Sequence, residues 1–544
     1  MLTRFQVGIA VLIRVLIALC TSTVFQPDEY FQSLEPAHHL VFGYGHLTWE
    51  WLNPRPIRSI LYPALNVPIY WALKITALDS LGAYGDWLIA SPRILHGVFA
   101  SLTDIFLCSL TRNAVGERYV STVLLVSLSS LFHILSLSRS FSNSLETSLT
   151  TIAFSYYPWN LGSGLAIDRS RVRKTLGFAA LACAIRPTNA VIWVYLIGLL
   201  FWTMRLSRRS LLAVIQDGIA ISAVTLSGLF VLDSLYYGTP TFTPLNFLVI
   251  NLSDVSLFYG GNPWHYYLSQ AIPIMCTTAL PFVLRETWYI LGGHAPVALR
   301  AMLGCVIWTI SVYSLAGHKE WRFIHPLLPL LHVFAAKALV DMSTTPRIRW
   351  WTLIMLLLTL PISCYIALFY CSAPIQVMAF IQSLPREELR DGGLGFLMPC
   401  HSTPGHAYLH RKELADGRLW ALGCEPPLQN QDSTTYRGQT SVFYESPYTY
   451  LKQRFPQSVD TAFPLSPFPM SVPGAITSGT TSLDQHPWMH TWPRYLIMFG
   501  ALLQEGGVRD LLEERGYKQV WSAGRSWEGD SDHRKGGVQV WKFV

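Results

Sequence analysis

The feature that most constrains this 544-residue chain is a series of apolar stretches, most of them about as long as a membrane is thick. A helix needs about 20 consecutive apolar residues to cross the hydrocarbon core of a bilayer. The stretches lie at 5–25, 87–111, 119–137, 148–159, 176–204, 211–236, 264–284, 299–317, 323–342 and 349–371. Of these, 148–159 is short. The pattern predicts a mainly helical protein that crosses a membrane many times.

Composition narrows the function classes. Half of the residues (51%) are hydrophobic and 13% are charged, whereas soluble globular chains carry roughly 25% charged residues. The net charge of +7 is modest, and nucleic-acid binding would need clustered Lys and Arg on a soluble face. The sequence contains no phosphate-binding loop, HExxH or GxSxG motif. The nine cysteines show no metal-ligand spacing, so we expect no metal site.

Basic residues predict the orientation of the chain, because short cytosolic loops are enriched in Lys and Arg. Basic clusters occur at 169–174, 205–209 and 347–349. The stretch 176–204 lies between two of them, so it must cross twice or dip and return, and Arg186-Pro187 at its middle is where a helix break is expected. The first stretch is expected to be an uncleaved anchor with a cytosolic N-terminus. About eleven crossings follow, and the C-terminus then lies in the lumen.

This topology divides the chain into two domains. Residues 1–371 form the membrane domain, in which 26–86 is the first lumenal loop. Residues 372–544 are rich in Pro, Gly, Ser and His. Short alternating runs at 439–444 and 536–543 indicate a small mixed α/β lumenal domain, with a loose Pro/Ser stretch near 462–482.

Two features fit a lumenal compartment. Cys400 and Cys424 could form a disulfide there, or they could remain buried free thiols. Asn251 begins an Asn-Leu-Ser sequon in a loop that is predicted to be lumenal, so it is a candidate glycosylation site.

The first lumenal loop opens with an acidic pair, Asp28 and Glu29. Partial desolvation beside the membrane and the proximity of two like charges both raise a carboxyl pKa, which suits a general base that works near neutral pH. Alternatively, the pair caps a short helix that starts after Pro27, where negative charge is favourable.

A second polar cluster, His318, Lys319 and Arg322, lies where one predicted crossing ends and the next begins. Three potentially cationic groups at the interface are suited to a lipid-linked phosphate. They could instead extend towards headgroups as ordinary membrane-edge charges.

Arg186 is expected within or near the membrane, where an arginine is costly and therefore a candidate functional residue. Alternatively, it pairs with a buried acid such as Asp104 or Asp233. Arg93 and Asp104 share one face of a predicted helix, and we expect them to lock helices together rather than to line a cavity.

Aromatic and polar side chains in the lumenal loops are candidates for contact with a sugar. They are Tyr30, Gln32, Glu35, His38, Trp49, Glu50, Trp264 and His265. The tryptophans could equally serve as interface anchors.

At this point the sequence resembles a known family, the GPI mannosyltransferases of glycosyltransferase family 22, which belong to the multi-pass GT-C class. The matching segments occur in order along the chain at 27–35, 42–51, 185–188, 258–265, 318–323 and 398–404. Two departures are Gln26, where many members carry His before Pro-Asp-Glu, and Trp321, where relatives often carry an acidic or another aromatic residue.

The resemblance implies an enzyme of the endoplasmic reticulum membrane that uses dolichyl-phosphate mannose. It implies transfer of the third mannose, in α1,2 linkage, to the GPI-anchor precursor. A β-linked donor and an α product require inversion by one displacement, with Asp28 as the base and Glu29 as its partner or substitute. His318, Lys319, Arg322 and Arg186 would bind the donor phosphate, and no cofactor is required.

Two alternatives follow from the same residues. One is another lumenal mannosyltransferase of family 22, acting on the fourth GPI mannose or on the N-glycan precursor. The other is a lipid or sugar transporter, which the absence of an internal repeat disfavours.

Overall fold

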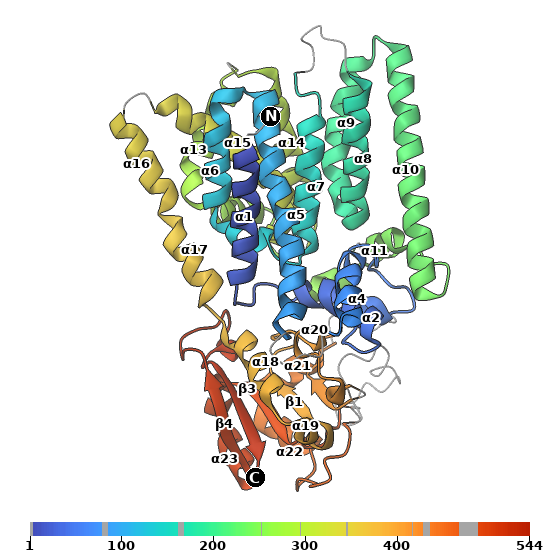
Figure 1. Cartoon of the computed structure of the whole chain (residues 1–544), viewed down its shortest axis with the longest axis vertical. Helices are drawn as coiled ribbons and strands as arrows, with labels where there is room; N and C mark the ends of the chain where they lie inside the picture. The colour runs from blue at the N-terminus through green and yellow to red at the C-terminus, as the bar shows by residue number, and fades with distance from the viewer. Residues whose placement is uncertain are drawn as a thin grey trace.

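The computed structural model describes residues 4–78, 85–160, 168–251, 253–293, 295–343, 346–415, 417–427, 436–466 and 488–544. A bundle of long helices occupies one end of the molecule, and a five-stranded sheet with its helices occupies the other (Figure 1). The N-terminus lies in the bundle and the C-terminus beside the sheet. The predicted combination of a helical membrane part and a small α/β part is confirmed.

The bundle contains eleven long helical segments in the described part of the chain. They are α1 (Arg4–Cys20), α5 (Gly85–Ala114), α6 (Val120–Ser129), α7 (Ser142–Tyr156), α8 (Arg169–Ile185), α9 (Ala190–Met204), α10 (Arg208–Tyr237), α12 and α13 (Ile272–Cys276 and Leu280–Leu291), α14 (Val297–Ser314), α15 (Leu328–Met342), and α16 and α17 (Pro346–Leu357 and Thr359–Leu368).

Seven helical segments among the described residues are long and apolar enough to cross a membrane. They begin at residues 87, 187, 208, 267, 297, 321 and 350, and each overlaps a predicted crossing. The other four predicted crossings correspond to α1, α6, α7 and α8, helices of 10 to 17 residues. In α10 only 11% of the most apolar window is buried inside the protein, as expected of a helix that faces lipid.

The predicted break between α8 and α9 is present. Arg186 has extended backbone angles (φ −142°, ψ 108°), because the proline that follows disfavours the helical region for its predecessor. The chain then reverses, so α8 and α9 run side by side (Figure 1).

The tight packing of α1 on α5 depends on a glycine and a buried ion pair. A Cβ at Gly97 would lie 2.8 Å from the Cα of Val15, so only glycine allows this approach. Arg14 and Asp104 form an ion pair at 2.7 Å with both side chains fully buried. On the same helix, Arg93 donates to the Tyr408 hydroxyl at 3.1 Å. Asp104 therefore connects α5 to α1, and Arg93 connects α5 to Tyr408 of the sheet region.

The loop after α1 folds into short helices that lie between the bundle and the sheet (Figure 1). They are the π-helix η1 (Tyr30–Leu34), α2 (Glu35–Phe42), α3 (Trp49–Leu52), η2 (Pro63–Leu65) and α4 (Val67–Ile75). Pro36 and Pro68 occupy first-turn positions of α2 and α4, where a missing N–H costs nothing.

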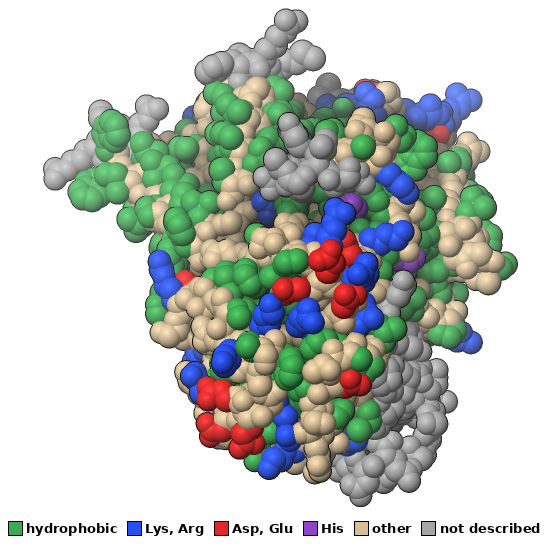
Figure 2. Space-filling view, turned by 60° about the horizontal axis from the view of Figure 1, so that its bottom comes forward, with side chains coloured by type: hydrophobic (Ala, Val, Ile, Leu, Met, Phe, Trp, Pro, Cys, Tyr) green, Lys and Arg blue, Asp and Glu red, His purple; other side chains and the backbone are tan. Residues whose placement is uncertain are grey.

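The sheet has the strand order β2-β1-β3-β5-β4. Its strands are β1 (Leu394–Leu397), β2 (Leu419–Ala421), β3 (Tyr495–Phe499), β4 (Tyr517–Ala523) and β5 (Val538–Phe543). β1 is parallel to β2 and β3, whereas β5 is antiparallel to β3 and β4. On the face that this end of the molecule presents, charged side chains of both signs lie among polar and hydrophobic ones (Figure 2).

Of the two alternating runs, 536–543 contains strand β5, but 439–444 belongs to helix α21 (Gln439–Glu445). In α21 the buried Gln439 and Phe443 lie four residues apart on one helical face. The alternating run at 439–444 is therefore helical rather than a strand, within a region that is mixed α/β as predicted. Most of the predicted Pro/Ser stretch at 462–482 lies outside the described residues.

A shared hydrophobic core joins the first loop to the sheet. Tyr30, Phe31 and Leu34 pack in one cluster with Leu394, Phe396 and neighbouring sheet residues. The acidic pair lies directly before Tyr30, so the sheet region is anchored beside it.

Candidate active site

The acidic pair begins a helix whose first turns are unusually wide. Asp28 and Glu29 are its first helical residues, and the π-helical turn Tyr30–Leu34 follows directly. The predicted N-terminal position is therefore confirmed, although the side chains do not cap this helix. They contact arginines from two different parts of the bundle instead. π-helical turns occur frequently at functional sites.

Asp28 is joined to the second predicted cluster. Arg322 donates from Nη1 to Asp28 Oδ2 at 2.5 Å and from Nη2 to Glu320 Oε1 at 2.7 Å. The Asp28 side chain remains 15% exposed. The structure thus brings together an accessible carboxylate and an arginine that lie 294 residues apart in sequence.

Glu320 holds this cluster together. Burial opposes its ionisation, but the charge of Arg322 and a hydrogen bond from His318 more than offset burial and lower the pKa of Glu320 to about 2. The same hydrogen bond, at 3.1 Å, raises the pKa of His318. Ionised Glu320 thus fixes the Arg322 guanidinium beside Asp28.

Glu29 has a different environment. Its carboxylate accepts from Arg139 at 2.9 Å, and the two side chains are 6% and 5% exposed. Arg139 also donates to the Thr23 carbonyl at 2.6 Å and the Leu135 carbonyl at 2.7 Å. Glu29 is therefore held in a buried, fully engaged pair, which leaves Asp28 as the accessible member of the two.

Arg186 is paired with a buried acid, but neither of the predicted ones. Its Nε lies 3.4 Å from Glu146 of α7, which also accepts from Asn189. Asp104 pairs with Arg14, and Asp233 accepts hydrogen bonds from Ser59, Ile60 and Thr243. The predicted partners Asp104 and Asp233 were wrong because helical periodicity does not reveal which helix faces which.

Arg186 nevertheless lies near Arg322. The two guanidinium groups lie 5.7 and 5.8 Å from the ring centre of Phe323. Arg186 also lines a cavity of about 500 Å³ together with Gln32 and Arg58. The remaining lining residues come from the first loop, α7, the α8–α9 turn and α11 (Thr243–Asn251). This cavity, which we call the arginine cavity, lies between the first loop and the ends of the adjoining helices.

Two of the predicted sugar-binding residues position Arg58. Glu50 accepts from Arg58 at 2.7 Å and from Gln32 at 3.1 Å. Arg58 was missed by sequence reasoning, because a single arginine in a long loop carries no distinguishing pattern. Its partner Glu50 was the only signal.

Two other predicted residues lie in interior contacts between the first loop and the sheet region. Glu35 is fully buried and accepts from the backbone N–H groups of His46 at 2.8 Å and Ala407 at 2.6 Å. His38 is fully buried and contacts Tyr44 and His410. These contacts indicate that Glu35 and His38 attach one part of the protein to the other.

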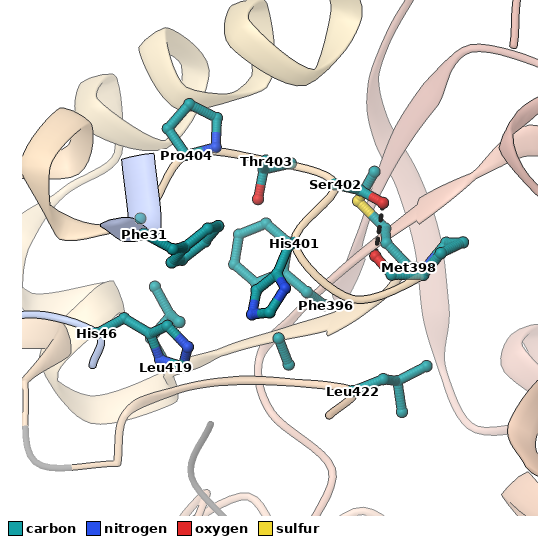
Figure 3. A pocket seen from close by; sticks show the side chains of 13 residues that line it. Phe31, His46, Phe396, Met398, His401, Ser402, Thr403, Pro404, Leu419 and Leu422 are labelled. Atoms are coloured by element: carbon teal, nitrogen blue, oxygen red, sulfur yellow. Dashed lines mark hydrogen bonds between the residues drawn. The ribbon is translucent and has the colours of Figure 1, made fainter. Parts of the chain in front are cut away.

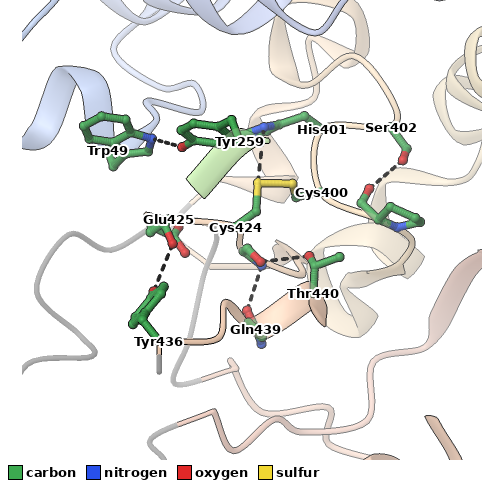
Figure 4. The surroundings of a disulfide bond; sticks show 12 residues. Trp49, Tyr259, Cys400, His401, Ser402, Cys424, Glu425, Tyr436, Gln439 and Thr440 are labelled. Atoms are coloured by element: carbon green, nitrogen blue, oxygen red, sulfur yellow. Dashed lines mark hydrogen bonds between the residues drawn. A yellow bond between two sulfur atoms is a disulfide. The ribbon is translucent and has the colours of Figure 1, made fainter. Parts of the chain in front are cut away.

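Tyr30 and Trp49 are also buried. Tyr30 packs edge-on against Tyr408 at 5.2 Å between ring centres. Trp49 donates from its indole to the Tyr259 hydroxyl at 2.9 Å, close to the Cys400–Cys424 disulfide (Figure 4).

The remaining predicted residues lie at the edge of this region. Lys319 is 3% exposed, and its amine donates to the Asn262 carbonyl at 2.8 Å. Trp264 is 71% exposed and packs against His265, which is also exposed. Asn251, at the end of α11, is exposed.

Cys400 and Cys424 are joined by a disulfide with a Cα–Cα distance of 5.9 Å, so the disulfide alternative is the one observed. Among the described residues, one group of His, Cys, Asp or Glu has metal-ligand spacing, Cys400, His401 and Cys424. Because the two sulfurs are bonded to each other, they cannot act as thiolate ligands.

The fold is that of a multi-pass membrane glycosyltransferase of the GT-C class. A solved structure of ArnT from Cupriavidus metallidurans, described as bound to undecaprenyl phosphate, superposes with a TM-score of 0.57 at 11% identity. The match covers 99% of this chain and 97% of that one. At this identity the likeness concerns the fold alone.

The chain belongs to the Alg9-like mannosyltransferase family, which residues 7–410 match. GPI mannosyltransferase 3 of Yarrowia lipolytica is 35% identical over 97% of this chain and 95% of its own length. GPI alpha-1,2-mannosyltransferase 3 of Mus musculus is 34% identical over 83% and 79%, and that of Homo sapiens 33% identical over 81% and 76%.

Proposed function

We propose that the chain transfers the third mannose, in α1,2 linkage, from dolichyl-phosphate mannose to the GPI-anchor precursor in the endoplasmic reticulum membrane. The names of the similar proteins support the acceptor and the linkage. The observation that carries the mechanism is the accessible Asp28 carboxylate beside Arg322 at 2.5 Å.

In this mechanism Asp28 takes the proton of the acceptor hydroxyl. The acceptor oxygen forms a bond to C1 of mannose from the side opposite the phosphate, and the bond between C1 and the phosphate oxygen breaks. Mannose is transferred with inversion, and dolichyl phosphate leaves with the bonding electrons.

In this proposal Arg322 and Arg186, whose guanidinium groups both lie near the Phe323 ring, stabilise the negative charge on the leaving phosphate. Preorganised guanidinium groups in a water-poor site act where charge develops. Arg58 adds a third positive group in the arginine cavity, which lies where the first loop meets the helix ends. A divalent metal is not required for this step on chemical grounds, because the phosphate already leaves as a stable anion.

The orientation that we propose has a cytosolic N-terminus and a lumenal sheet region. It places Asp28, Asn251 and the Cys400–Cys424 disulfide in one oxidising compartment.

Glycolipid profiling of a strain that lacks this protein tests the proposal. We expect a GPI precursor with two mannoses to accumulate. Accumulation of a three-mannose precursor, or of a truncated N-glycan donor, would instead assign the chain to another family 22 reaction. Re-expression of the wild-type chain should clear the accumulated species.

A further inference from the structure

A second cavity, which we call the loop cavity, lies between the first loop and the sheet region. It is a partly open hollow whose lining is mainly apolar. Phe31 and His46 of the first loop line it together with residues 396, 398–399, 401–405, 419 and 421–422 of the sheet region. The imidazoles of His46 and His401 project into the same space (Figure 3), with ring centres 6.1 Å apart.

The loop 398–405 is fixed at both ends. The Cys400–Cys424 disulfide holds its start (Figure 4). At its end, Glu35 accepts from Ala407 N–H, and a Cβ at Gly405 would lie 2.8 Å from the Glu35 carboxylate. The glycine therefore allows the loop to approach the first loop closely.

His401 is held in a costly backbone conformation. Its φ is 56°, a left-handed value that non-glycine residues rarely adopt. Its ring centre lies 4.4 Å from that of Phe31. Strained backbone that the surroundings enforce is concentrated at functional sites, and here it turns the imidazole towards the cavity.

His46 offers an unused hydrogen-bonding atom. The residue is 6% exposed, and its Nε2 has no hydrogen-bond partner within the part of the chain that the structure describes. A buried polar atom without a partner is costly, and a ligand hydroxyl would satisfy it. Burial lowers the pKa of His46 well below its usual value and that of His401 to about 4. Both rings are therefore neutral at physiological pH. His401 Nδ1 contacts the disulfide sulfur of Cys424 at 3.7 Å, so Nε2 of His401 and Nε2 of His46 are the atoms that a sugar hydroxyl can reach.

The loop cavity is close to the reacting carboxylate but distinct from the arginine cavity. The charge of Asp28 acts on His401, opposing the effect of burial on its pKa. Phe31 lines the loop cavity, whereas the next residue, Gln32, lines the arginine cavity. The helix that begins at Asp28 thus separates two cavities.

We propose that the loop cavity binds the terminal hexose of the acceptor glycan, with His46 and His401 hydrogen-bonding its hydroxyls and Phe31 packing against its apolar face. This assignment rests on the proposed function. In this assignment the sheet region has a direct role in the site, because its residues form one wall of the acceptor subsite.

The test is a comparison of His46→Gln and His401→Gln with wild type in a detergent-solubilised transfer assay. His533→Gln is the control, since His533 is exposed and lines neither this cavity nor the adjoining one that shares His46. We expect each cavity variant to raise the acceptor KM about five- to tenfold, as the loss of about one hydrogen bond does, with the donor KM changed less than twofold. An unchanged acceptor KM, or an equal rise in both constants, would overturn the assignment.

A second measurement needs no variant. Hydrogen exchange of wild-type protein is followed with an acceptor analogue that carries two mannoses and, separately, with dolichyl phosphate. We expect residues 399–405 to be protected by the analogue and not by dolichyl phosphate; no protection by the analogue would contradict the assignment. Wild-type protein that transfers no mannose would reject the proposed function itself, whereas active wild type with unaffected variants would reject only the loop cavity.

Discussion

Arg322 donates a hydrogen bond of 2.5 Å to Asp28, and the same guanidinium bonds Glu320. The arginine therefore keeps an anionic partner when Asp28 is neutralised. A substitution that neutralises Asp28 should therefore affect the reaction without destabilising the fold.

Asp28→Asn should abolish transfer and leave the protein folded. Removal of a general base costs about 10²- to 10⁴-fold in rate, and asparagine preserves the size of the side chain. Transfer from labelled dolichyl-phosphate mannose in microsomes measures the effect, and the thermal unfolding midpoint monitors the fold. A near wild-type rate would show that Asp28 is not the base.

Glu29→Gln should affect stability more than the chemical step. The substitution leaves the Arg139 charge without its carboxylate partner at a site where both side chains are nearly buried. Breaking such a pair costs about 3–5 kcal/mol. Chemical denaturation of the purified variant should show this loss, and the folded fraction should retain measurable transfer. If the variant is fully stable but transfers no mannose, Glu29 rather than Asp28 is the base.

Arg58→Gln should weaken binding of the donor. Arg58 lines the arginine cavity with Arg186, so its loss should raise the donor KM about tenfold, the size of one charge-assisted hydrogen bond. The acceptor KM should change little. Arg55→Gln is a matched control, because Arg55 lies three residues earlier and is exposed. Equal effects of both variants would argue against a specific phosphate contact.

The sequence predicted much of the arrangement around Asp28. Counting crossings placed the acidic pair and the cluster 318–322 on the same side of the membrane, and the structure brings Asp28 and Arg322 into contact. The helix break at Arg186 followed from proline chemistry alone. Membrane crossings and helix breaks depend on residues that are close together in the sequence, so they can be predicted from it.

Features that depend on contacts between distant elements were not predictable. The partners of Arg186 and Glu29 proved to be Glu146 and Arg139, because only the rotation and pairing of helices decide which charges meet. The loop cavity was missed for the same reason. Its walls come from segments more than 350 residues apart, and the sequence motif at 398–404 was distinctive without indicating its position.

Asn251→Gln should remove an N-linked glycan. Asn251 is exposed at the end of α11, at the same end of the bundle as the first-loop helices (Figure 1). Oligosaccharyl transfer requires this side to be lumenal. We expect endoglycosidase treatment to increase the mobility of the wild-type protein and to leave that of the variant unchanged. If protease added to sealed microsomes cleaves the sheet region, the proposed orientation is wrong.

Glu35 should make the attachment of the sheet region to the first loop depend on pH. Burial raises the pKa of Glu35 to about 7, although backbone hydrogen bonds from His46 and Ala407 oppose this effect. Because the folded-state pKa exceeds the unfolded value of 4.5, its contribution to stability is complete below about pH 4.5 and is lost as the pH rises to about 7. A difference of this size corresponds to about 3 kcal/mol.

Comparison of wild type with Glu35→Gln between pH 4.5 and 8 measures this contribution. Glutamine cannot ionise, so the stability of wild type relative to the variant should fall with rising pH and level off near pH 7. The neighbouring His38 and His406, whose pKa values burial lowers, titrate in both proteins and cancel in the difference. Thermal unfolding in detergent provides the readout. A difference that is constant over this range would show that Glu35 keeps one protonation state in the folded protein.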